Sequence, residues 1–201
     1  TIASSGEDQT VGRTKLYGVP RGTASFVGRE PDLASLTELL DRGNNIGVSA
    51  SIHGLAGIGK TELAIRLAKT LASIGKFPGG VYWLDAEQPD LLGGWDAIGE
   101  KLGIPAGPDR ASLALRTVSD QPHECLLILD NVTSWKMEVR PHPLPDGEHV
   151  QFLATTRSRS LGTGFRHHAV QVLPEKAATE LLERLGVKPT ADGFRELLEY
   201  L

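Results

Sequence analysis

The sequence predicts an α/β fold in which helices cover a parallel sheet. Short apolar segments with the length and alternation of strands recur along the chain, and segments with apolar residues at helical spacing lie between them. Residues 125–129 are apolar at every position, as expected for a central strand covered on both faces. The length of 201 residues suits one domain and at most a fragment of a second.

The composition of the chain narrows the classes of function. Hydrophobic residues make up 40% of the chain and charged residues 23%, which is typical of a globular protein. The net charge of −4 gives no basic excess that would indicate direct nucleic-acid binding or an anionic membrane surface. No apolar run approaches the length of a membrane-spanning helix, and the single Cys125 cannot form an internal disulfide. We therefore expect a cytoplasmic protein without membrane contact.

The chain is expected to begin with a linker. Residues 1–25 are rich in Ser, Thr, Gly and charge without an apolar period, so they predict a segment that is only partly ordered. Pro31 and Asp32 then suit the first turn of a helix, and Gly43 lies where that helix would end. The apolar face of this helix comprises Leu33, Leu36, Leu39 and Leu40.

The remaining elements follow from the same two patterns. Strands are expected at residues 46–52, 81–84, 125–129, 152–155 and 169–173. Helices are expected at residues 62–73, 91–102, 111–118 and 175–185. The last apolar residues, up to Leu201, keep helical spacing without a cap, so we expect the chain to be part of a longer protein.

The strongest motif lies between the first of these strands and the helix after it. Residues 54–61 read GLAGIGKT, which fits the pattern GxxxxGK[ST] of a phosphate-binding loop. Its glycines allow successive backbone N–H groups to converge on a phosphate at a helix N-terminus. Lys60 would place its charge between the β- and γ-phosphates, and the Thr61 hydroxyl would bind Mg²⁺. The motif predicts a ligand that carries a diphosphate.

A second motif supplies the acidic partner of the metal. The apolar run at residues 125–129 ends in Asp130, as in the Walker B strand, whose carboxylate supports Mg²⁺. The next residue is Asn131, so the acid that often acts as general base there is absent, and we expect slow hydrolysis. Asp85 and Glu87 are substitute bases if their strand lies beside the Walker strands; solvated loop acids are the alternative interpretation.

A cation follows the strand expected at residues 152–155. Arg157 could reach the γ-phosphate and thereby distinguish ATP from ADP. Arg159 competes for this role, and a plain surface position is the alternative interpretation of Arg157.

Four short motifs in a fixed order carry a resemblance to a known family. They are FVGRE at residues 26–30, the phosphate loop at residues 54–61, LLILDNV at residues 126–132 and ATTR at residues 154–157. With these motifs the chain resembles the NB-ARC class of STAND P-loop NTPases. That class includes the nucleotide-binding domains of plant disease-resistance proteins, apoptotic-protease-activating factors and bacterial multidomain regulators.

The resemblance implies a fold and a set of ligand-binding residues. The fold is a three-layer P-loop NTPase domain with a parallel five-stranded sheet at residues 26–173, followed by the truncated beginning of a helical module at residues 174–201. The ligand is an adenine nucleotide, ATP or ADP, with Mg²⁺. The residues expected to bind the nucleotide are Phe26, Val27, Arg29, Gly54, Ala56, Gly57, Ile58, Gly59, Lys60, Thr61 and Glu62.

The resemblance also implies roles in a molecular switch. Thr61 and Asp130 would hold the metal, and Lys60, Asp130 and Arg157 would be the catalytic residues of a weak ATPase. ADP would keep a signalling or regulatory protein closed, and ATP would allow a homo-oligomer to form with the protein's own helical and winged-helix modules beyond Leu201. Two alternatives stay open. They are a conventional ATPase or kinase with ordinary turnover, and an interaction module with permanently bound structural ADP.

Overall fold

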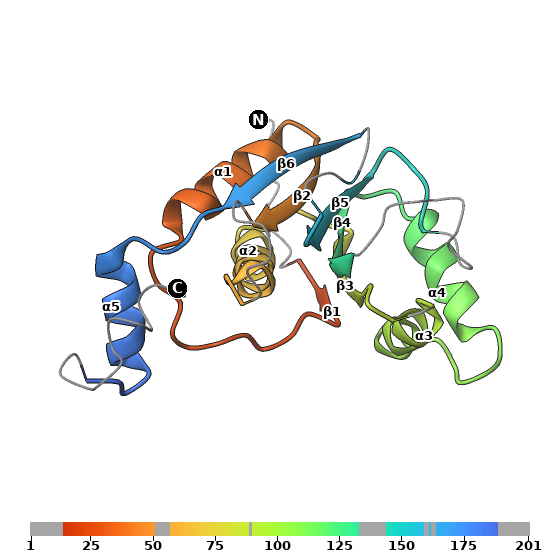
Figure 1. Cartoon of the computed structure of the whole chain (residues 1–201). Coiled ribbons are helices and arrows are strands. Elements are labelled where there is room, and N and C mark those ends of the chain that lie inside the picture. The colour runs from red at the N-terminus through yellow and green to blue at the C-terminus, as the bar shows by residue number, and fades with distance from the viewer. Residues whose placement is uncertain are drawn as a thin grey trace, which may run out of the picture.

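A computed structural model describes residues 14–50, 57–88, 90–132, 144–158, 161 and 164–188. The strands are β1 Leu16–Tyr17, β2 Asn45–Ala50, β3 Gly80–Asp85, β4 Cys125–Val132, β5 Val150–Thr156 and β6 Phe165–Val170. The helices are α1 Glu30–Asp41, α2 Lys60–Ser73, α3 Leu92–Lys101, α4 Arg110–Ser119 and α5 Glu175–Arg184. The parallel strands form one sheet in the order β1-β3-β4-β5-β2-β6. Figure 1 shows α1 and α2 on one face of this sheet and α3 and α4 on the other, which confirms the predicted three-layer α/β fold.

The side chains on the two faces of the central strands pack in two separate hydrophobic cores. Leu126 and Ile128 of β4 pack in the core under α1 and α2, whereas Leu127 and Leu129 pack in the core under α3 and α4. All four side chains are fully buried. Because successive side chains of a strand point to opposite faces, a strand covered on both sides needs apolar residues at every position. This requirement explains the continuous apolar run predicted as a central strand.

The sheet has six strands rather than the five expected, because β1 joins its edge. This strand lies within the segment predicted as a linker. It pairs with β3, where the N–H of Val81 donates to the carbonyl of Lys15 at 2.9 Å. The ring of Tyr17 stacks on the ring of Tyr82, with centroids 4.8 Å apart. A strand of two residues is too short to show an alternation in the sequence.

The last strand lies four residues earlier than expected. The prediction of a strand at residues 169–173 was wrong in its bounds, since β6 pairs with β2 in register from Asn45↔Phe165 to Ala50↔Val170. β6 is an edge strand, and its side chains are largely exposed. Because exposure permits polar residues, the sequence of β6 lacks the apolar run by which buried strands are predicted.

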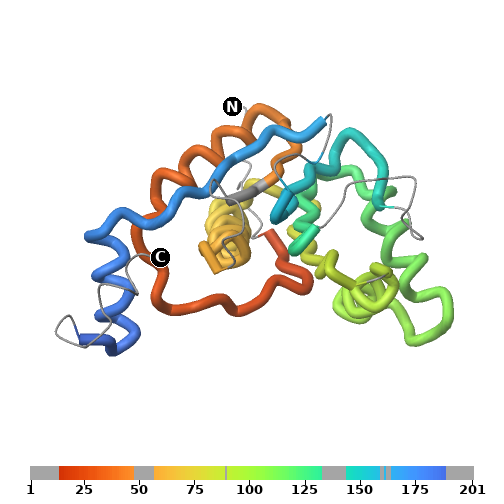
Figure 2. Tube along the Cα trace, viewed as in Figure 1, coloured from red at the N-terminus to blue at the C-terminus, as the bar shows by residue number. Residues whose placement is uncertain are grey.

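A segment that we call the strap, residues 18–29, connects β1 to α1. Figure 2 shows the strap passing alongside α2. The carboxylate of Glu62 accepts a hydrogen bond from the N–H of Thr23 at 2.8 Å. One helical turn further along α2, the guanidinium of Arg66 lies 4.8 Å from the ring centroid of Phe26. The strap is therefore held along α2, the helix that follows the phosphate loop.

The strap also touches α5, which lies to the left of α1 and α2 in Figure 1. Gly28 has a φ of +68°, and a Cβ placed on it would lie only 2.4 Å from the Cβ of Ala177 in α5. A side chain at position 28 would thus meet both backbone strain and a steric clash. Glycine at this position allows the strap and α5 to pack together.

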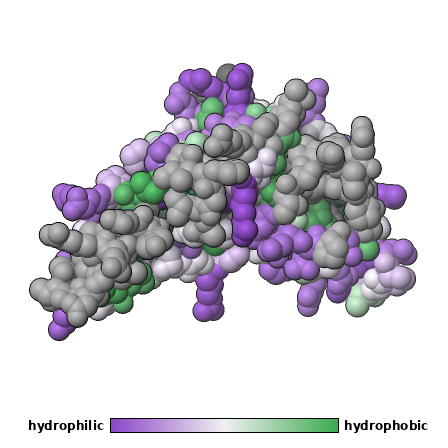
Figure 3. Space-filling model, in the orientation of Figure 1, coloured by the Kyte–Doolittle hydropathy of each residue, from purple (hydrophilic) through white to green (hydrophobic). Residues whose placement is uncertain are grey.

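The coloured part of the surface in Figure 3 is mostly hydrophilic, with small separate hydrophobic areas. Among the residues that the structure describes, no helix combines the length and apolar character needed to cross a membrane. The large hydrophobic side chains of Ile74 and Leu185 are about 60% exposed, but they lie on different elements.

Candidate functional site

The described part of the phosphate loop leads directly into α2. Gly57 and Gly59 have φ values of +86° and +92°, in the left-handed region that favours glycine. Gly59 is the N-cap of α2, and its carbonyl accepts the first helical hydrogen bond from the N–H of Leu63 at 2.8 Å. The loop therefore ends at a helix N-terminus, where free backbone N–H groups favour an anion. The predicted ligands Gly54 and Ala56 lie outside the described residues.

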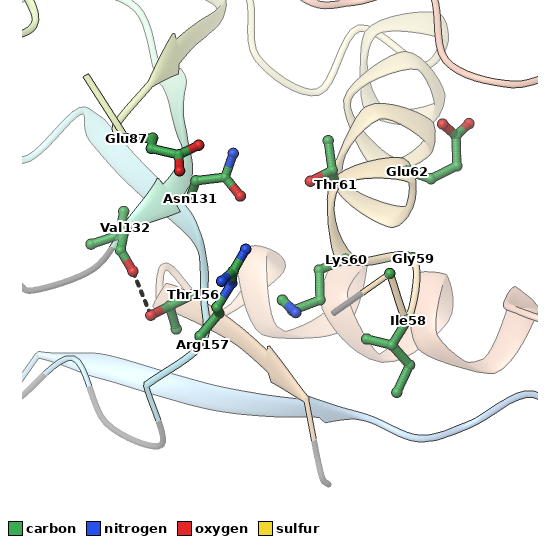
Figure 4. Close-up of a pocket in the computed structure, with 11 residues that line it drawn as sticks. Ile58, Gly59, Lys60, Thr61, Glu62, Glu87, Asn131, Val132, Thr156 and Arg157 are labelled. Carbon is green, nitrogen blue, oxygen red and sulfur yellow. Dashed lines mark hydrogen bonds between the residues drawn. The ribbon is translucent and has the colours of Figure 1, made fainter. Parts of the chain in front are cut away.

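A cavity of about 360 Å³ lies in front of this helix N-terminus. It is lined by the phosphate loop and first turn of α2, by the turn after β3, and by the ends of β4 and β5. We call it the phosphate cavity. Figure 4 shows Lys60 on the helix side of it and Arg157 across from it on the strand side, where Glu87 and Asn131 also lie. The fold thus brings the predicted cations from two distant motifs to one site.

The surroundings of Lys60 lower the pKa of its side chain. Burial lowers the pKa of its ammonium, the positive charge of Arg157 lowers that pKa further, and the negative charge of Asp130 opposes both effects. Two cations that share one cavity repel each other. A chain of phosphates bound between them would offset this repulsion.

The candidate metal ligands are already in contact. The Thr61 hydroxyl donates a hydrogen bond to Oδ1 of Asp130 at 2.9 Å, although 69 residues separate them in the sequence. A hydroxyl and a carboxylate are the hard oxygen ligands that Mg²⁺ prefers, and Mg²⁺ completes its shell with water and phosphate oxygens. The two residues therefore fit the ion that the phosphate loop implies. Within the described part of the chain, no three His, Cys, Asp or Glu side chains gather into another metal site.

Asp130 is held by a third residue, Thr155, which sequence reasoning missed. The Thr155 hydroxyl donates to Oδ1 of Asp130 at 2.5 Å and accepts the N–H of Asn131 at 2.9 Å. The β4–β5 register is irregular here, because Leu129 pairs with Ala154 but Val132 pairs with Thr156. Asp130 and Asn131 consequently face one residue, as in a β-bulge. The sequence carries only a weak signal for this role, namely the threonines at the end of an apolar strand.

Asn131 has a φ of +64°. In the part of the chain that the structure describes, it is the only residue other than glycine with a positive φ. Asparagine tolerates this left-handed conformation better than most residues. The bulge turns its side chain into the phosphate cavity, where Figure 4 shows it beside Glu87. The residue that replaces an acid after Asp130 is therefore part of the site.

Arg29, which we expected to bind nucleotide, holds the phosphate loop through the carbonyl of Ile58 and also lines a second cavity beside the loop. Its side chain is nearly buried, with 8% exposed. One nitrogen donates to the carbonyl of Ile58 at 2.9 Å, and another donates to the carbonyl of Gln171 at 2.6 Å. A third contact joins Arg29 to Asp32 at 3.4 Å. Arg29 thereby ties the phosphate loop to the strap and to the segment after β6.

A second cavity of about 210 Å³ lies on the other side of the phosphate loop, and we call it the base cavity. The phosphate cavity and the base cavity share Gly57, Ile58, Gly59 and Glu62 as lining residues. Figure 4 shows the Glu62 carboxylate pointing away from Lys60 and Arg157, consistent with its hydrogen bond to the strap. The strap and the C-terminal segment form the remaining walls, with the apolar residues Phe26, Val27, Leu173, Leu181 and Leu185 and the polar residues Thr23, Ser25 and Arg29.

Comparison with known families decides what kind of domain this is. A sequence profile of the NB-ARC domain matches residues 29–192 of the chain. The chain belongs to the NB-ARC domain family. The match confirms the resemblance drawn from the four short motifs, and it covers helices α1 to α5 and strands β2 to β6 but neither β1 nor residues 18–28 of the strap. NB-ARC domains are nucleotide-binding P-loop domains, which agrees with a glycine-rich loop that ends at the N-terminus of α2.

Among curated proteins, the NB-ARC chain is similar to apoptotic protease-activating factor 1. The identity to the Homo sapiens protein is 29% over 180 residues, which is 79% of this chain and 14% of that protein. The identity to the Danio rerio protein is 27% over 185 residues, which is 82% of this chain and 14% of that protein. This chain therefore spans about one seventh of the length of these relatives.

Solved structures support the fold. The ORC1 protein of Aeropyrum pernix in complex with DNA superposes with a TM-score of 0.53 at 18% identity, over 80% of this chain and 50% of that chain. A Walker-type ATPase of Pyrococcus abyssi superposes with a TM-score of 0.54 at 11% identity, over 93% of this chain and 65% of that chain. At these identities the likeness concerns the P-loop ATPase fold alone.

Proposed function

We propose that this NB-ARC domain binds ATP and ADP with Mg²⁺ and acts as the switch of a cytoplasmic signalling or regulatory protein. The observation that carries this proposal is the arrangement of the phosphate cavity. Lys60 and Arg157 lie on opposite sides of it, and the Thr61–Asp130 pair lies at the N-terminus of α2. A nucleoside triphosphate with one divalent cation balances these charges.

The phosphates would bind at the N-terminus of α2. Its free N–H groups and the Lys60 ammonium attract the β- and γ-phosphates, and the partial positive charge of the helix adds to this attraction. Thr61 and Asp130 would hold Mg²⁺, which neutralises part of the phosphate charge when it is bound. Thr155 fixes the Asp130 carboxylate in place for this purpose.

The adenine would occupy the base cavity. This cavity is next to the phosphate cavity and is lined largely by apolar side chains, as a planar base requires. Leu181 of α5 and the adjacent Leu185 form part of its wall. Binding of the base would therefore favour the position in which α5 packs on the strap, and this coupling would link the nucleotide to the modules that follow. Exchange of ADP for ATP would release them for homo-oligomerisation.

Arg157 would distinguish the two nucleotides. It lies at the end of β5 and lines the phosphate cavity, on the side that faces Lys60. A cation there favours the extra charge of the γ-phosphate. Hydrolysis would be slow, because Asn131 supplies an amide where an acid would take the proton of the attacking water.

The proposal is tested by what the purified protein carries. The chain is purified without added nucleotide and denatured, and the released nucleotide is identified by chromatography, with Lys60→Ala as the comparison. We expect near-stoichiometric ADP from the wild type and little from the variant. If Lys60→Ala retains wild-type affinity for ATP and ADP, the assignment of the phosphate cavity is wrong.

Affinity and rate measurements separate the switch from the two alternatives. Arg157→Ala should reduce the preference for ATP over ADP, whereas Arg116→Ala, at an exposed position on α4, should leave it unchanged. A steady-state rate of about 1–1,000 per second would indicate a conventional ATPase or kinase. Bound ADP that never exchanges would indicate a structural nucleotide in an interaction module.

A further inference from the structure

We propose that Glu87 is the general base that activates water for ATP hydrolysis, in place of the acid missing at Asn131. The inference rests on the proposed function, because it concerns the reaction of ATP bound in the phosphate cavity. It starts from the position of Glu87 in that cavity. The carboxylate of Glu87 lies beside Asn131 at the strand ends, across the cavity from Lys60.

The pairing of β3 with β4 explains how Glu87 reaches the cavity. The two strands run parallel, and Asp85, the last residue of β3, lies opposite Asp130, two residues before the end of β4. The chain turns at once, and the N–H of Ala86 donates to the carbonyl of Asp130 at 2.7 Å. This hydrogen bond holds the turn after β3 against the end of β4, next to the candidate metal ligand. The position of Glu87 is therefore set by the sheet.

Two acids, Asp85 and Glu87, lie near this turn, and their carboxylates have different roles. The carboxylate of Asp85 accepts hydrogen bonds from the N–H of Glu87 at 3.1 Å and from the side-chain amide of Gln88 at 3.5 Å. Asp85 thus shapes the turn that presents Glu87. The side chain of Glu87 lines the phosphate cavity and is exposed to solvent, so water has access to it.

The chemistry requires a carboxylate at this place. A water molecule on the Glu87 side would form a bond from its oxygen to the γ-phosphorus. The bond from that phosphorus to the bridging oxygen would break, and ADP would leave with the bonding electron pair. The Glu87 carboxylate would take the proton that the attacking water gives up. The Asn131 amide can orient this water through a hydrogen bond but has no basic group to accept the proton.

The test compares single-turnover hydrolysis of ATP in MgCl₂ by the wild type, Glu87→Gln and Glu100→Gln. Glu100 is an exposed glutamate on α3 and serves as the matched control. We expect Glu87→Gln to lower the rate about 100-fold, with affinities for ATP and ADP within twofold of the wild type. Glu87→Ala should behave in the same way. Glu100→Gln should hydrolyse ATP at the wild-type rate.

The outcomes distinguish this inference from the function on which it rests. A Glu87→Gln rate within threefold of the wild type, with unchanged ADP affinity, overturns the role of Glu87. A wild type that binds ATP tightly and never hydrolyses it also overturns this role, but leaves nucleotide binding intact. A wild type that binds neither ATP nor ADP overturns the proposed function itself.

Discussion

The hydroxyl of Thr61 donates a hydrogen bond to Oδ1 of Asp130 across 2.9 Å, which joins the first turn of α2 to the carboxyl end of β4. The contact places the Asp130 carboxylate next to Thr61, which lines the phosphate cavity. A hydroxyl and a carboxylate held this close together supply two of the oxygen ligands that Mg²⁺ prefers. This relationship supports a role for both residues in Mg²⁺ binding.

Asp130→Asn should remove the effect of Mg²⁺ on ATP binding. The amide keeps the size of the carboxylate but loses its charge, so the affinity for ATP in MgCl₂ should fall to the affinity measured in EDTA. Asp109→Asn is the control, since Asp109 makes no side-chain capping hydrogen bond at the start of α4. Isothermal titration with and without Mg²⁺ measures both variants. If Asp130→Asn keeps a wild-type difference between MgCl₂ and EDTA, Asp130 does not support the metal.

Lys60→Met should stabilise the nucleotide-free protein and abolish stabilisation by ADP. The folded-state pKa of Lys60 lies below its ordinary value of 10.5, mainly through burial. Protonation of Lys60 therefore costs stability at neutral pH, and this cost disappears as the pH rises through the folded-state pKa toward 10.5. Lys60→Met should raise the Tm without nucleotide and make stability less dependent on pH in that window. Lys101→Met, exposed on α3, is the control.

The same variant should lose the response to ligand. ADP at 100 times its dissociation constant stabilises the wild type by about 2.7 kcal/mol by mass action, and Lys60→Met should gain little under those conditions. Thermal unfolding with and without ADP measures both effects. A Lys60→Met protein that is less stable than the wild type without ADP would show that the partly buried charge of Lys60 does not destabilise the fold.

Thr155→Val should destabilise the fold by about 2 kcal/mol, because it removes a hydroxyl that serves two partners. Valine has the shape of threonine, but the N–H of Asn131 and the carboxylate of Asp130 each lose a hydrogen bond. Thr117→Val is the control, since its exposed hydroxyl bonds only to a carbonyl of its own helix. Urea unfolding measures both. Equal losses in the two variants would mean that Thr155 has no special role at the bulge.

Local sequence patterns predicted the helices of this domain well, because each helix carries its own signal. The helix predicted at residues 111–118 is α4 Arg110–Ser119, for example, and its buried residues Ala111, Ala114 and Val118 have helical spacing. β1 carries no comparable signal, since backbone pairing and one stacked ring hold its two residues. Elements stabilised by their own amphipathic face are predictable, whereas elements recruited by a neighbouring edge are not.

Site residues that belong to a local motif could be predicted from the sequence. Site residues that reach their partners only through the order of the strands could not. Lys60 and Asp130 follow from their motifs alone. Thr155 lies next to Asp130 only because β5 pairs with β4, and no local pattern encodes that pairing. The role of Arg29 depends on the same kind of information, since its partner Gln171 is 142 residues away in the sequence.

Arg29→Lys should destabilise the protein by about 2 kcal/mol and weaken ADP binding, although the charge is conserved. A guanidinium donates from separate nitrogens in a fixed plane, whereas an ammonium cannot serve the carbonyls of Ile58 and Gln171 in the same geometry. Arg42→Lys is the control, because Arg42 forms an exposed ion pair with Glu38 and such pairs contribute about 0–1 kcal/mol. Stability without ligand and affinity for ADP are compared. Similar effects of the two variants would rule out a positioning role for Arg29.

Gly28→Ala should separate backbone strain from the contact between the strap and α5. Gly43→Ala is the matched control: Gly43 has a φ of +72°, close to the +68° of Gly28, but a Cβ there would have no neighbour within 4 Å. Strain alone should cost about 1–2 kcal/mol at Gly43. Gly28→Ala should cost more, because its Cβ meets Ala177, and ADP affinity should also fall since α5 lines the base cavity.

A compensating change gives the decisive comparison for Gly28. Ala177→Gly removes the atom that a Cβ at position 28 would strike, at a helix-propensity cost of about 1 kcal/mol. The double variant should therefore be more stable than the sum of the two single effects indicates, by about 1–3 kcal/mol, and it should recover part of the lost ADP affinity. Strict additivity in stability and in affinity would show that Gly28 and α5 do not constrain each other. Non-additivity in both would show that the packing of the strap on α5 and the binding of ADP depend on each other.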